Sequence, residues 1–333
     1  MGSTGNPPDS LDEKTQVRFV SSAQNTSPAN TVAVALDDHM VYAFFVLVHS
    51  LTSTQQAPFH LVVGHFTGRL APDNITLMED FLKTRPLTYE IKELSPHELF
   101  TERRHLTITT FSKFVISDDL PTAHLWIDLD TVARAGWDDI FEAIHTADPS
   151  IPLVVARKID SPQTRFEGFN AGVLGWTNSA RQPWLEELGN LPEKRFSSEQ
   201  YLFNTLYRDN NLVVDSRFNF LSSWHAHAAE RERASIFHYS GPIKPWHLNR
   251  RHRGAWREIN PTWEAWFRAE ELLLSDPSFD GVKALKKRAK QALTSGRLHT
   301  GKGALAGWFM RFLVFAGPLG DPLVWWLKRR AQR

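Results

Sequence analysis

The chain has 333 residues, a formal net charge of +1 and no cysteine. Its length allows one large domain or two smaller ones with a proper core, and the lack of cysteine excludes disulfides, thiolate metal sites and cysteine nucleophiles. The charge is uneven, because residues 281–333 carry 12 lysines and arginines against one acid, whereas residues 1–280 carry 26 basic and 36 acidic side chains. An acidic body argues against a general nucleic-acid-binding surface and leaves only the tail for an anionic partner.

The first 29 residues are rich in Ser, Pro, Asn and Gly and lack the apolar core of a secretory signal. We therefore expect a disordered tail at 1–29, a cytoplasmic protein and a main folded domain at 30–280. A basic, aromatic tail follows at 281–333.

Strand and helix patterns alternate along the main domain, which favours a parallel sheet with helices packed on it. The predicted strands are 31–36, 59–66, 87–94, 124–127, 151–156 and 170–176. The predicted helices are 40–51, 75–83, 109–117, 183–188 and 198–207, and an irregular region closes with 238–247. The sequence contains no internal repeat and no Rossmann glycine fingerprint.

An acidic pair follows the strand predicted at 124–127, where Asp128-Leu129-Asp130 continues the apolar run. Ligands of open α/β sheets gather at the carboxyl ends of the strands. Alternate residues of an extended segment project to one side, so the two carboxylates can share a divalent cation with a pyrophosphate. Short acidic triplets are also common as exposed loop carboxylates, but acids at the end of a buried strand need a cation or hydrogen-bond donors.

A second group of polar residues lies in the segment His238-Tyr-Ser-Gly241-Pro-Ile-Lys244-Pro-Trp246. It offers an imidazole ligand, a glycine that lets the backbone approach a phosphate, and a lysine point charge. These are the groups that a site for a metal and a diphosphate requires. The alternatives are an ordinary loop rich in Pro and Gly, with a packed Trp246, and a satisfied core histidine at His238.

Four short blocks follow one another in the chain: Ala35-Leu-Asp37-Asp38, Ile127-Asp-Leu-Asp130-Thr, Phe169-Asn170-Ala-Gly172-Val and the loop from His238 to Trp246. In this order they resemble glycosyltransferase family eight, whose members include bacterial lipooligosaccharide galactosyltransferases and, more distantly, glycogenin. Weaker matches at Arg104–Thr110 and Glu199-Gln200 fall between them, and the resemblance covers about residues 31 to 250. It implies one nucleotide-sugar-binding α/β domain of Rossmann-like, GT-A type with a mostly parallel central sheet.

The resemblance also implies a role for each matched residue. Asp128, Asp130 and His238 would hold a divalent ion, Mn²⁺ in preference to Mg²⁺, that bridges the two phosphates of a UDP-sugar. The implied donor contacts are Ala35, Asp37, His39, Lys113, Asp128, Leu129, Gly241 and Lys244, and the implied sugar-side residues are Asp160, Asn170, Glu199 and Gln200. Two positions depart from the family. Lys113 stands in place of an arginine, so the guanidinium that could form two parallel hydrogen bonds is absent. His39 stands where an asparagine is common.

The activity expected from this resemblance is the metal-dependent, retaining transfer of a hexose, galactose or glucose, from a UDP-sugar to a hydroxyl of a glycan or glycolipid. Front-side attack with Gln200 as stabiliser and double displacement through Glu199 or Gln200 both stay open. The alternatives are a nucleotide-sugar hydrolase or phosphatase, for which Asp128 has too few carboxylates nearby, and a non-catalytic sugar-nucleotide-binding module. For Glu199-Gln200 the alternative is an ordinary solvated helix turn.

The C-terminal tail combines basic residues with large aromatics, which suits an anionic bilayer surface. The aromatics are Trp308, Phe309, Phe312, Phe315, Trp325 and Trp326. Charged residues and prolines interrupt the apolar stretch Ala304–Leu327, so we expect no clean transmembrane helix. The expected arrangement is peripheral attachment at the inner face of the cytoplasmic membrane, with a saccharide or lipid-linked acceptor. A C-terminal helix packed on the enzyme is the alternative.

Overall fold

The computed structural model describes residues 30–100, 107–120, 122–160, 168–191, 198–241, 244–247, 253–282, 284–285 and 287–288. The tail predicted at 1–29, the Arg104 end of the weak block, and the part of the basic tail beyond residue 288 lie outside these ranges. Among the described residues, no helix has both the length and the apolar character needed to cross a bilayer.

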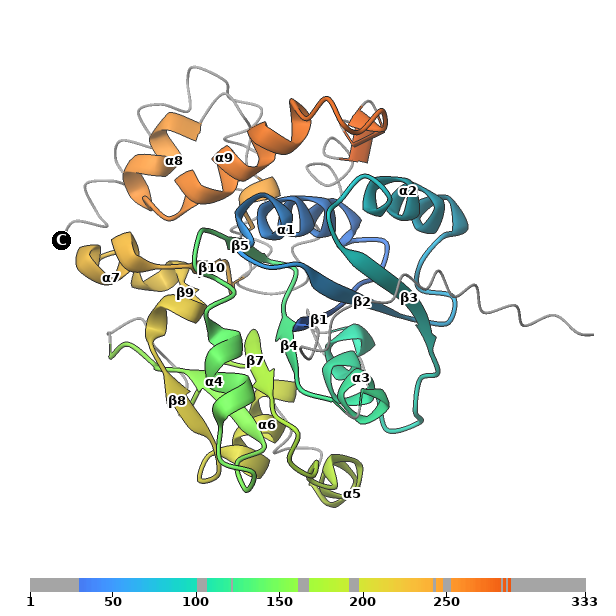
Figure 1. Cartoon of the computed structure of the whole chain (residues 1–333), viewed down its shortest axis with the longest axis vertical. Helices are drawn as coiled ribbons and strands as arrows, with labels where there is room; N and C mark the ends of the chain where they lie inside the picture. The colour runs from blue at the N-terminus through green and yellow to red at the C-terminus, as the bar shows by residue number, and fades with distance from the viewer. Residues whose placement is uncertain are drawn as a thin grey trace, which may run out of the picture.

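A seven-stranded sheet runs through the centre of the molecule in the order β3-β2-β1-β4-β7-β6-β8 (Figure 1). Its strands are Asn30–Ala35 (β1), Phe59–Phe66 (β2), Thr88–Leu94 (β3), His124–Ile127 (β4), Leu153–Ala156 (β6), Val173–Trp176 (β7) and Leu212–Val214 (β8). Only β7 is antiparallel to its neighbours, β4 and β6, and the other pairs are parallel. The prediction of an α/β fold with a mostly parallel sheet is confirmed.

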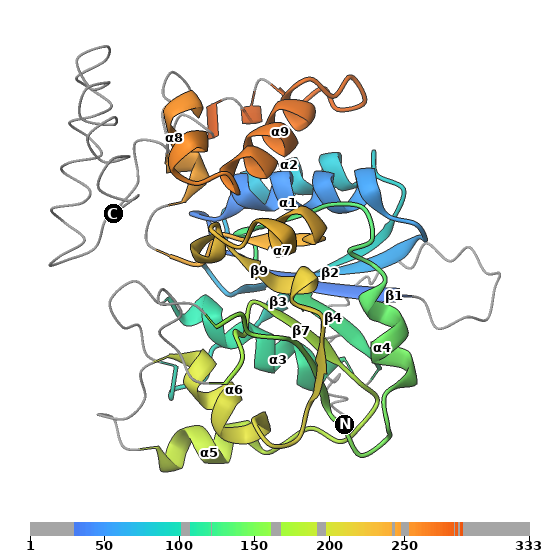
Figure 2. The same ribbon diagram turned by 90° about the vertical axis from the view of Figure 1, so that its left-hand side faces the viewer.

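Helices cover both faces of this sheet (Figure 2). They are Val41–Thr54 (α1), Pro72–Leu82 (α2), Ser112–Asp119 (α3), Ile140–Thr146 (α4), Trp184–Asn190 (α5), Glu199–Tyr207 (α6), Ala228–Arg233 (α7), Arg253–Ile259 (α8) and Trp263–Leu274 (α9). Side chains of α1, α2, α4 and α9 belong to one hydrophobic cluster, and those of α3, α5 and α6 belong to the other. Alternate residues of β1 enter the two clusters in turn, as the pleat of a strand requires.

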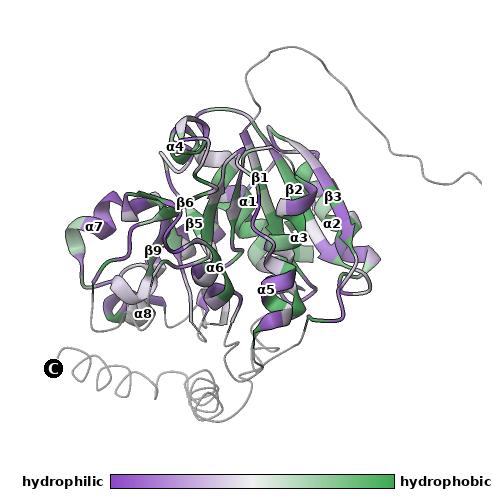
Figure 3. Ribbon diagram, turned by 90° about the horizontal axis from the view of Figure 1, so that it is seen from below, coloured by the Kyte–Doolittle hydropathy of each residue, from purple (hydrophilic) through white to green (hydrophobic). Residues whose placement is uncertain are grey.

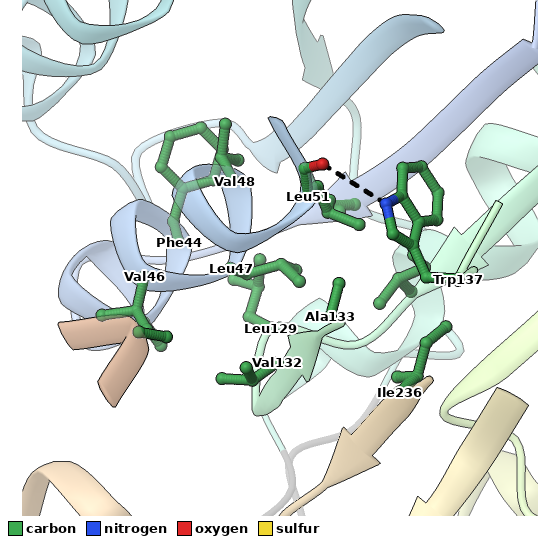
Figure 4. Packing of buried hydrophobic residues seen from close by; sticks show 14 of the residues in the cluster. Phe44, Val46, Leu47, Val48, Leu51, Leu129, Val132, Ala133, Trp137 and Ile236 are labelled. Carbon is green, nitrogen blue, oxygen red and sulfur yellow. Dashed lines mark hydrogen bonds between the residues drawn. The ribbon is translucent and has the colours of Figure 1, made fainter. Parts of the chain in front are cut away.

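The helix α1 is apolar on nearly all sides, and twelve of its residues, Val41 to Thr52, are buried. Such a helix is stable only where both of its sides are covered. The sheet layer lies beneath α1, and α9 stacks on its outer side (Figure 2). At its carboxyl end, Trp137 Nε1 donates to the carbonyl of Leu51 at 3.3 Å (Figure 4).

The sheet is buried at its centre and hydrophilic at one edge. Residues 31–35 of β1 are all buried, whereas β3 at the edge is buried only at Leu94 and carries several hydrophilic side chains (Figure 3). This difference explains why β1 has a continuous apolar run, as expected for a strand covered on both faces. The predicted boundaries agree with the observed ones to within a few residues, and 59–66 and 124–127 agree fully.

A second sheet of three short strands, in the order β5-β10-β9, was not predicted. Its strands are Thr131–Ala133 (β5), Phe220–Leu221 (β9) and Ile236–His238 (β10). Strands of two or three residues are too short to show an alternating pattern in the sequence. The region expected to be irregular before His238 therefore contains two strands of this sheet, β9 and β10, and His238 is the last residue of β10.

Candidate functional site

The small sheet brings the two sequence-predicted groups together. β5 follows Asp130 directly, and its antiparallel pairing with β10 places His238 opposite Thr131. Immediately beyond this pair, Tyr239 N donates to the carbonyl of Asp130 at 2.8 Å. The loop that begins at His238 is thereby held against the carboxyl end of β4, where the acidic pair lies.

Asp128, Asp130 and His238 form one cluster, in which one potential ligand atom from each lies within 4.8 Å of the others. His238 Nε2 is 3.3 Å from Asp130 Oδ1. Two carboxylates and one imidazole are a donor set that suits a divalent ion such as Mn²⁺. One premise of the sequence argument is wrong, because residues 129 and 130 form a turn instead of an extended segment. Leu129 has its side chain in the core, so only its backbone is available to a ligand.

Asp130 is buried between two nitrogen groups. Lys244 Nζ donates to Asp130 Oδ2 at 2.5 Å and to the Tyr239 carbonyl at 2.9 Å. Burial by itself would raise the pKa of Asp130, but the adjacent Lys244 ammonium holds that pKa well below its usual range. Asp130 is therefore ionised at neutral pH, as a metal ligand must be.

Asp128 is paired with a different cation, Lys113 of α3. Lys113 Nζ lies 3.0 Å from Asp128 Oδ1, 3.5 Å from Glu199 Oε1 and 3.0 Å from the Ala171 carbonyl. Burial would lower the pKa of Lys113, but the two carboxylates raise it above the usual value, so the side chain stays charged. Only 2% of the Lys113 side chain is exposed, and its ammonium is held by two carboxylates and one backbone carbonyl of the protein itself.

The side chains of Asn170 and Gln200 meet beside this cluster. Asn170 Nδ2 donates to Gln200 Oε1 at 2.9 Å, and the backbone N–H of Ala171 approaches the same oxygen at 3.4 Å. Glu199 Oε2 is buried without a hydrogen-bond partner among the described residues. The interpretation of Glu199-Gln200 as an ordinary solvated helix turn is wrong, because Glu199 is paired with Lys113 and Gln200 accepts from Asn170.

The two aspartates after β1 have different surroundings. Asp37 is buried, with its Oδ1 accepting from His39 N at 2.9 Å and its Oδ2 lying 3.4 Å from the hydroxyls of Thr107 and Thr109. Asp38 Oδ1 instead accepts from the backbone and side chain at the start of α2. Because β1 and β4 are parallel neighbours, Asp37 lies at the same sheet edge as Asp128.

Ala35 and His39, the other two residues predicted in this region, differ in exposure. Ala35 is buried in the core, so its side chain faces protein and only its backbone can meet a ligand. His39 is exposed. This end of β1 therefore offers one buried carboxylate and one exposed imidazole.

Two further predicted residues make no contact with this cluster among the described residues. Asp160 is exposed and lies beside residues outside the described ranges. Gly241 is exposed, and a Cβ placed on it would have no atom of the described structure within 4 Å. Packing among the described residues therefore does not require glycine at position 241.

Sequence reasoning missed two residues of the site. Trp126 Nε1 donates to Asp128 Oδ1 at 2.8 Å, and Asn219 Oδ1 lies 2.9 Å from His238 Nδ1. The only available signal for Trp126 was its place two residues before Asp128. Asn219 carries no local motif, because its partners come from distant parts of the chain.

Comparison with known proteins gives one family and a set of similar folds. The model of the family described as "Glycosyl transferase family 8" matches residues 31–250. The glycosyltransferase GlyE of Streptococcus pneumoniae TIGR4 aligns with a TM-score of 0.56 at 18% identity, covering 80% of this chain and 64% of GlyE. No curated protein sequence matches significantly.

Two other solved structures are similar. The bifunctional glycosyltransferase WbbM has a TM-score of 0.55 at 13% identity, with 81% of this chain and 53% of WbbM covered. The galactosyltransferase LgtC, solved with donor and acceptor sugar analogues, has a TM-score of 0.51 at 17% identity, with 78% and 95% covered. This chain thus spans less than two thirds of GlyE and of WbbM, and at these identities the likeness establishes the fold.

Proposed function

Because this chain belongs to glycosyl transferase family 8 and is therefore a glycosyltransferase, we propose that it moves a hexose, galactose or glucose, from a UDP-sugar to a hydroxyl of a glycan or glycolipid. The proposed reaction depends on a divalent metal and retains the anomeric configuration. The observation that carries the proposal is the cluster of Asp128, Asp130 and His238, with Lys244 on the second oxygen of Asp130.

The proposed leaving group is UDP, whose departure builds negative charge on a phosphate oxygen. A divalent ion held by Asp128, Asp130 and His238, Mn²⁺ in preference to Mg²⁺, would act as a Lewis acid on the diphosphate. The ammonium of Lys244 supplies a second positive charge at the same place, and Gly241 leaves open space for the approach of a phosphate. Charge placed in advance where negative charge develops stabilises the transition state.

The proposed nucleotide end of the site is the edge beyond β1. The buried carboxylate of Asp37 is an acceptor suited to an imide N–H or ribose hydroxyls, and the backbone of Ala35 lies beside it. The hydroxyls of Thr107 and Thr109, at 3.4 Å, keep this carboxylate in place. His39 is exposed next to Asp37, at a position where the family commonly has asparagine. We propose that this exchange changes the contact with the nucleotide.

The proposed sugar side consists of Asn170, Glu199 and Gln200, with Asp160 as a further hydroxyl contact. The unpartnered Glu199 Oε2 is an acceptor for a sugar hydroxyl. We favour front-side attack, in which the acceptor hydroxyl enters on the face that UDP leaves and passes its proton to a donor phosphate oxygen. Gln200 is a neutral amide, which is a poor nucleophile, and its oxygen already accepts from Asn170. Double displacement would therefore depend on Glu199, whose Oε1 is paired with Lys113.

The test is turnover of UDP-galactose and UDP-glucose with and without saccharide acceptors, before and after EDTA. We expect UDP release to require an acceptor, to stop on demetallation and to return with Mn²⁺, and NMR of the product to show retained configuration. Acceptor-independent release would indicate the hydrolase, and binding without turnover would indicate a non-catalytic module. Full activity in demetallated protein would contradict the metal assignment.

A further inference from the structure

A chain of hydrogen bonds connects His238 to Gln200 through two asparagines, and one backbone group sets its direction. Gly172 N–H, which can only donate, lies 3.0 Å from Asn170 Oδ1. That side-chain atom must therefore be the amide oxygen, and the Asn170 amino group then faces Gln200 Oε1 at 2.9 Å.

The same reasoning extends to Asn219 and His238. Because Asn170 presents its oxygen, Asn219 must turn its amino group toward it, at 2.9 Å. Asn219 Oδ1 is then the atom that faces His238 Nδ1 at 2.9 Å, and it can only accept. His238 must consequently carry a proton on Nδ1, and its neutral tautomer presents the Nε2 lone pair to the side on which Asp130 lies.

We propose that Asn219 is a positioning residue that sets the two halves of the site at once: it fixes the tautomer and ring orientation of His238, and it holds the Asn170–Gln200 pair. This inference rests on the proposed function. Asn219 is only 2% exposed and comes from the 3₁₀ helix Ser216–Asn219, just before β9. Asn219 thus joins His238 of the proposed metal site to Asn170 of the proposed sugar side, and Lys113 makes a second such link between Asp128 and Glu199.

Asn204 provides a matched control. It is also buried, and it holds the same loop from α6 by bonding both the N–H and the carbonyl of Phe169, at 2.8 and 2.9 Å. It has no bond to His238. Loss of Asn204 should therefore disturb the stability of this loop without changing the tautomer of the histidine.

The experiment measures Mn²⁺ dissociation constants of the full chain by EPR of free Mn²⁺, together with thermal unfolding and kcat. We expect Asn219→Ala to weaken Mn²⁺ binding about 10- to 100-fold, the usual effect of losing a partner of a metal-ligating histidine. Asn204→Ala should leave Mn²⁺ affinity at the wild-type value. Because both changes remove a buried amide, their unfolding temperatures serve to compare the structural damage.

Asn219→Asp separates the two roles and keeps the shape of the side chain. Aspartate still accepts from His238 Nδ1–H, so Mn²⁺ affinity should be kept or raised. It cannot donate to Asn170 Oδ1, so kcat should fall by about tenfold or more as Asn170 and Gln200 lose their orientation. ¹⁵N NMR of the demetallated wild type should show a protonated Nδ1 on His238.

Wild-type Mn²⁺ affinity in Asn219→Ala, or wild-type kcat in Asn219→Asp, would overturn the role of Asn219 alone. If the wild-type chain binds no Mn²⁺ and transfers sugar without metal, the metal assignment of the proposed function fails, and this inference fails with it.

Discussion

At the scale of single residues, Gly172 is required by the close approach of His238. A Cβ on Gly172 would overlap Cε1 and Nδ1 of the His238 ring and would come within 3.0 Å of Asn170 Oδ1. Glycine therefore lets the imidazole approach the backbone just before β7. The glycine of the block at 169–173 therefore shapes the proposed metal site without providing a ligand.

Gly172→Ala should displace the His238 ring and weaken both Mn²⁺ binding and transfer, by about tenfold or more, because a shifted ligand cannot keep its geometry. Calorimetric titration with Mn²⁺ measures the effect. Gly254→Ala is the control, since a Cβ there meets open space in α8 and alanine is a better helix former. Unchanged Mn²⁺ affinity in Gly172→Ala would show that the ring is not held as described.

Asp130→Asn keeps the shape of the side chain but removes the charge that faces Lys244 and His238. Transfer should fall by more than about 100-fold, because changes outside the ligand shell already cost 10- to 100-fold. Circular dichroism should show an intact fold. A folded variant with near-wild-type transfer would rule out Asp130 as a metal ligand.

At the scale of elements, α9 supports the site although it lies beyond the residues that match the family. Tyr239, which follows His238, accepts at its hydroxyl from Trp266 N at 3.1 Å and donates to the Thr262 carbonyl at 2.8 Å. The far end of α9 is held by Asp276, whose Oδ2 lies 2.6 Å from Arg85 Nη1. We infer that α9 fixes the loop carrying His238 and Lys244 against the body of the protein.

The ion pair at Asp276 gives a prediction for pH dependence. Burial would raise the pKa of Asp276, but the hydrogen bonds from Ser278 and the adjacent Arg85 guanidinium lower the pKa to about 2. Because this pKa is below the unfolded value of about 3.9, the contribution to stability is complete above about pH 4 and is lost as pH falls toward 2. After allowance for solvent screening, it is about 1 kcal/mol.

Asp276→Asn should therefore lower the free energy of unfolding by about 1 kcal/mol at pH 7, and the difference from wild type should vanish near pH 2. Urea unfolding across this pH range tests it. Asp80→Asn is the control, because Asp80 pairs with Lys83 on the surface, where both side chains are more than half exposed. A difference that persists at pH 2 would mean that charge is not its source.

At the scale of the whole molecule, the core continues into the segment proposed as a tail. Leu285 is completely buried and belongs to the same hydrophobic cluster as Phe279. The proposed boundary at residue 280 would therefore remove a core residue, and a truncation that tests the tail should follow Arg288. The remaining tail, 289–333, keeps all six aromatic residues and eight basic residues against Asp321.

We predict that this tail brings the enzyme to an anionic membrane. Each basic residue near such a surface contributes on the order of 1 kcal/mol, and apolar insertion adds to it. In flotation assays, the full chain should bind vesicles containing phosphatidylserine and not pure phosphatidylcholine. Truncation after Arg288 should abolish this binding and leave transfer to a soluble acceptor intact. Failure of the full chain to bind anionic vesicles at low salt would refute the proposal.

The sequence by itself was sufficient for the alternation of strands and helices, because that depends on local apolar patterns such as 59–66 and 124–127. Its short motifs also indicated Asp128, Asp130, His238 and Lys244 as candidate site residues, and the family resemblance added Asn170 and Gln200. Residue type, order and spacing are displayed directly by a linear chain, and hydrogen bonds and ion pairs connect these six candidates in the structure.

Only the tertiary structure decided how these residues are held. The pairing of β5 with β10, the role of Asn219 and the burial of Lys113 depend on contacts between residues far apart in the chain. Strands of three residues have no readable period, and an amide or ammonium has no preferred partner until folding places one beside it. The direction of the hydrogen bonds from His238 to Gln200 follows from the backbone N–H of Gly172, whose position exists only in the folded chain.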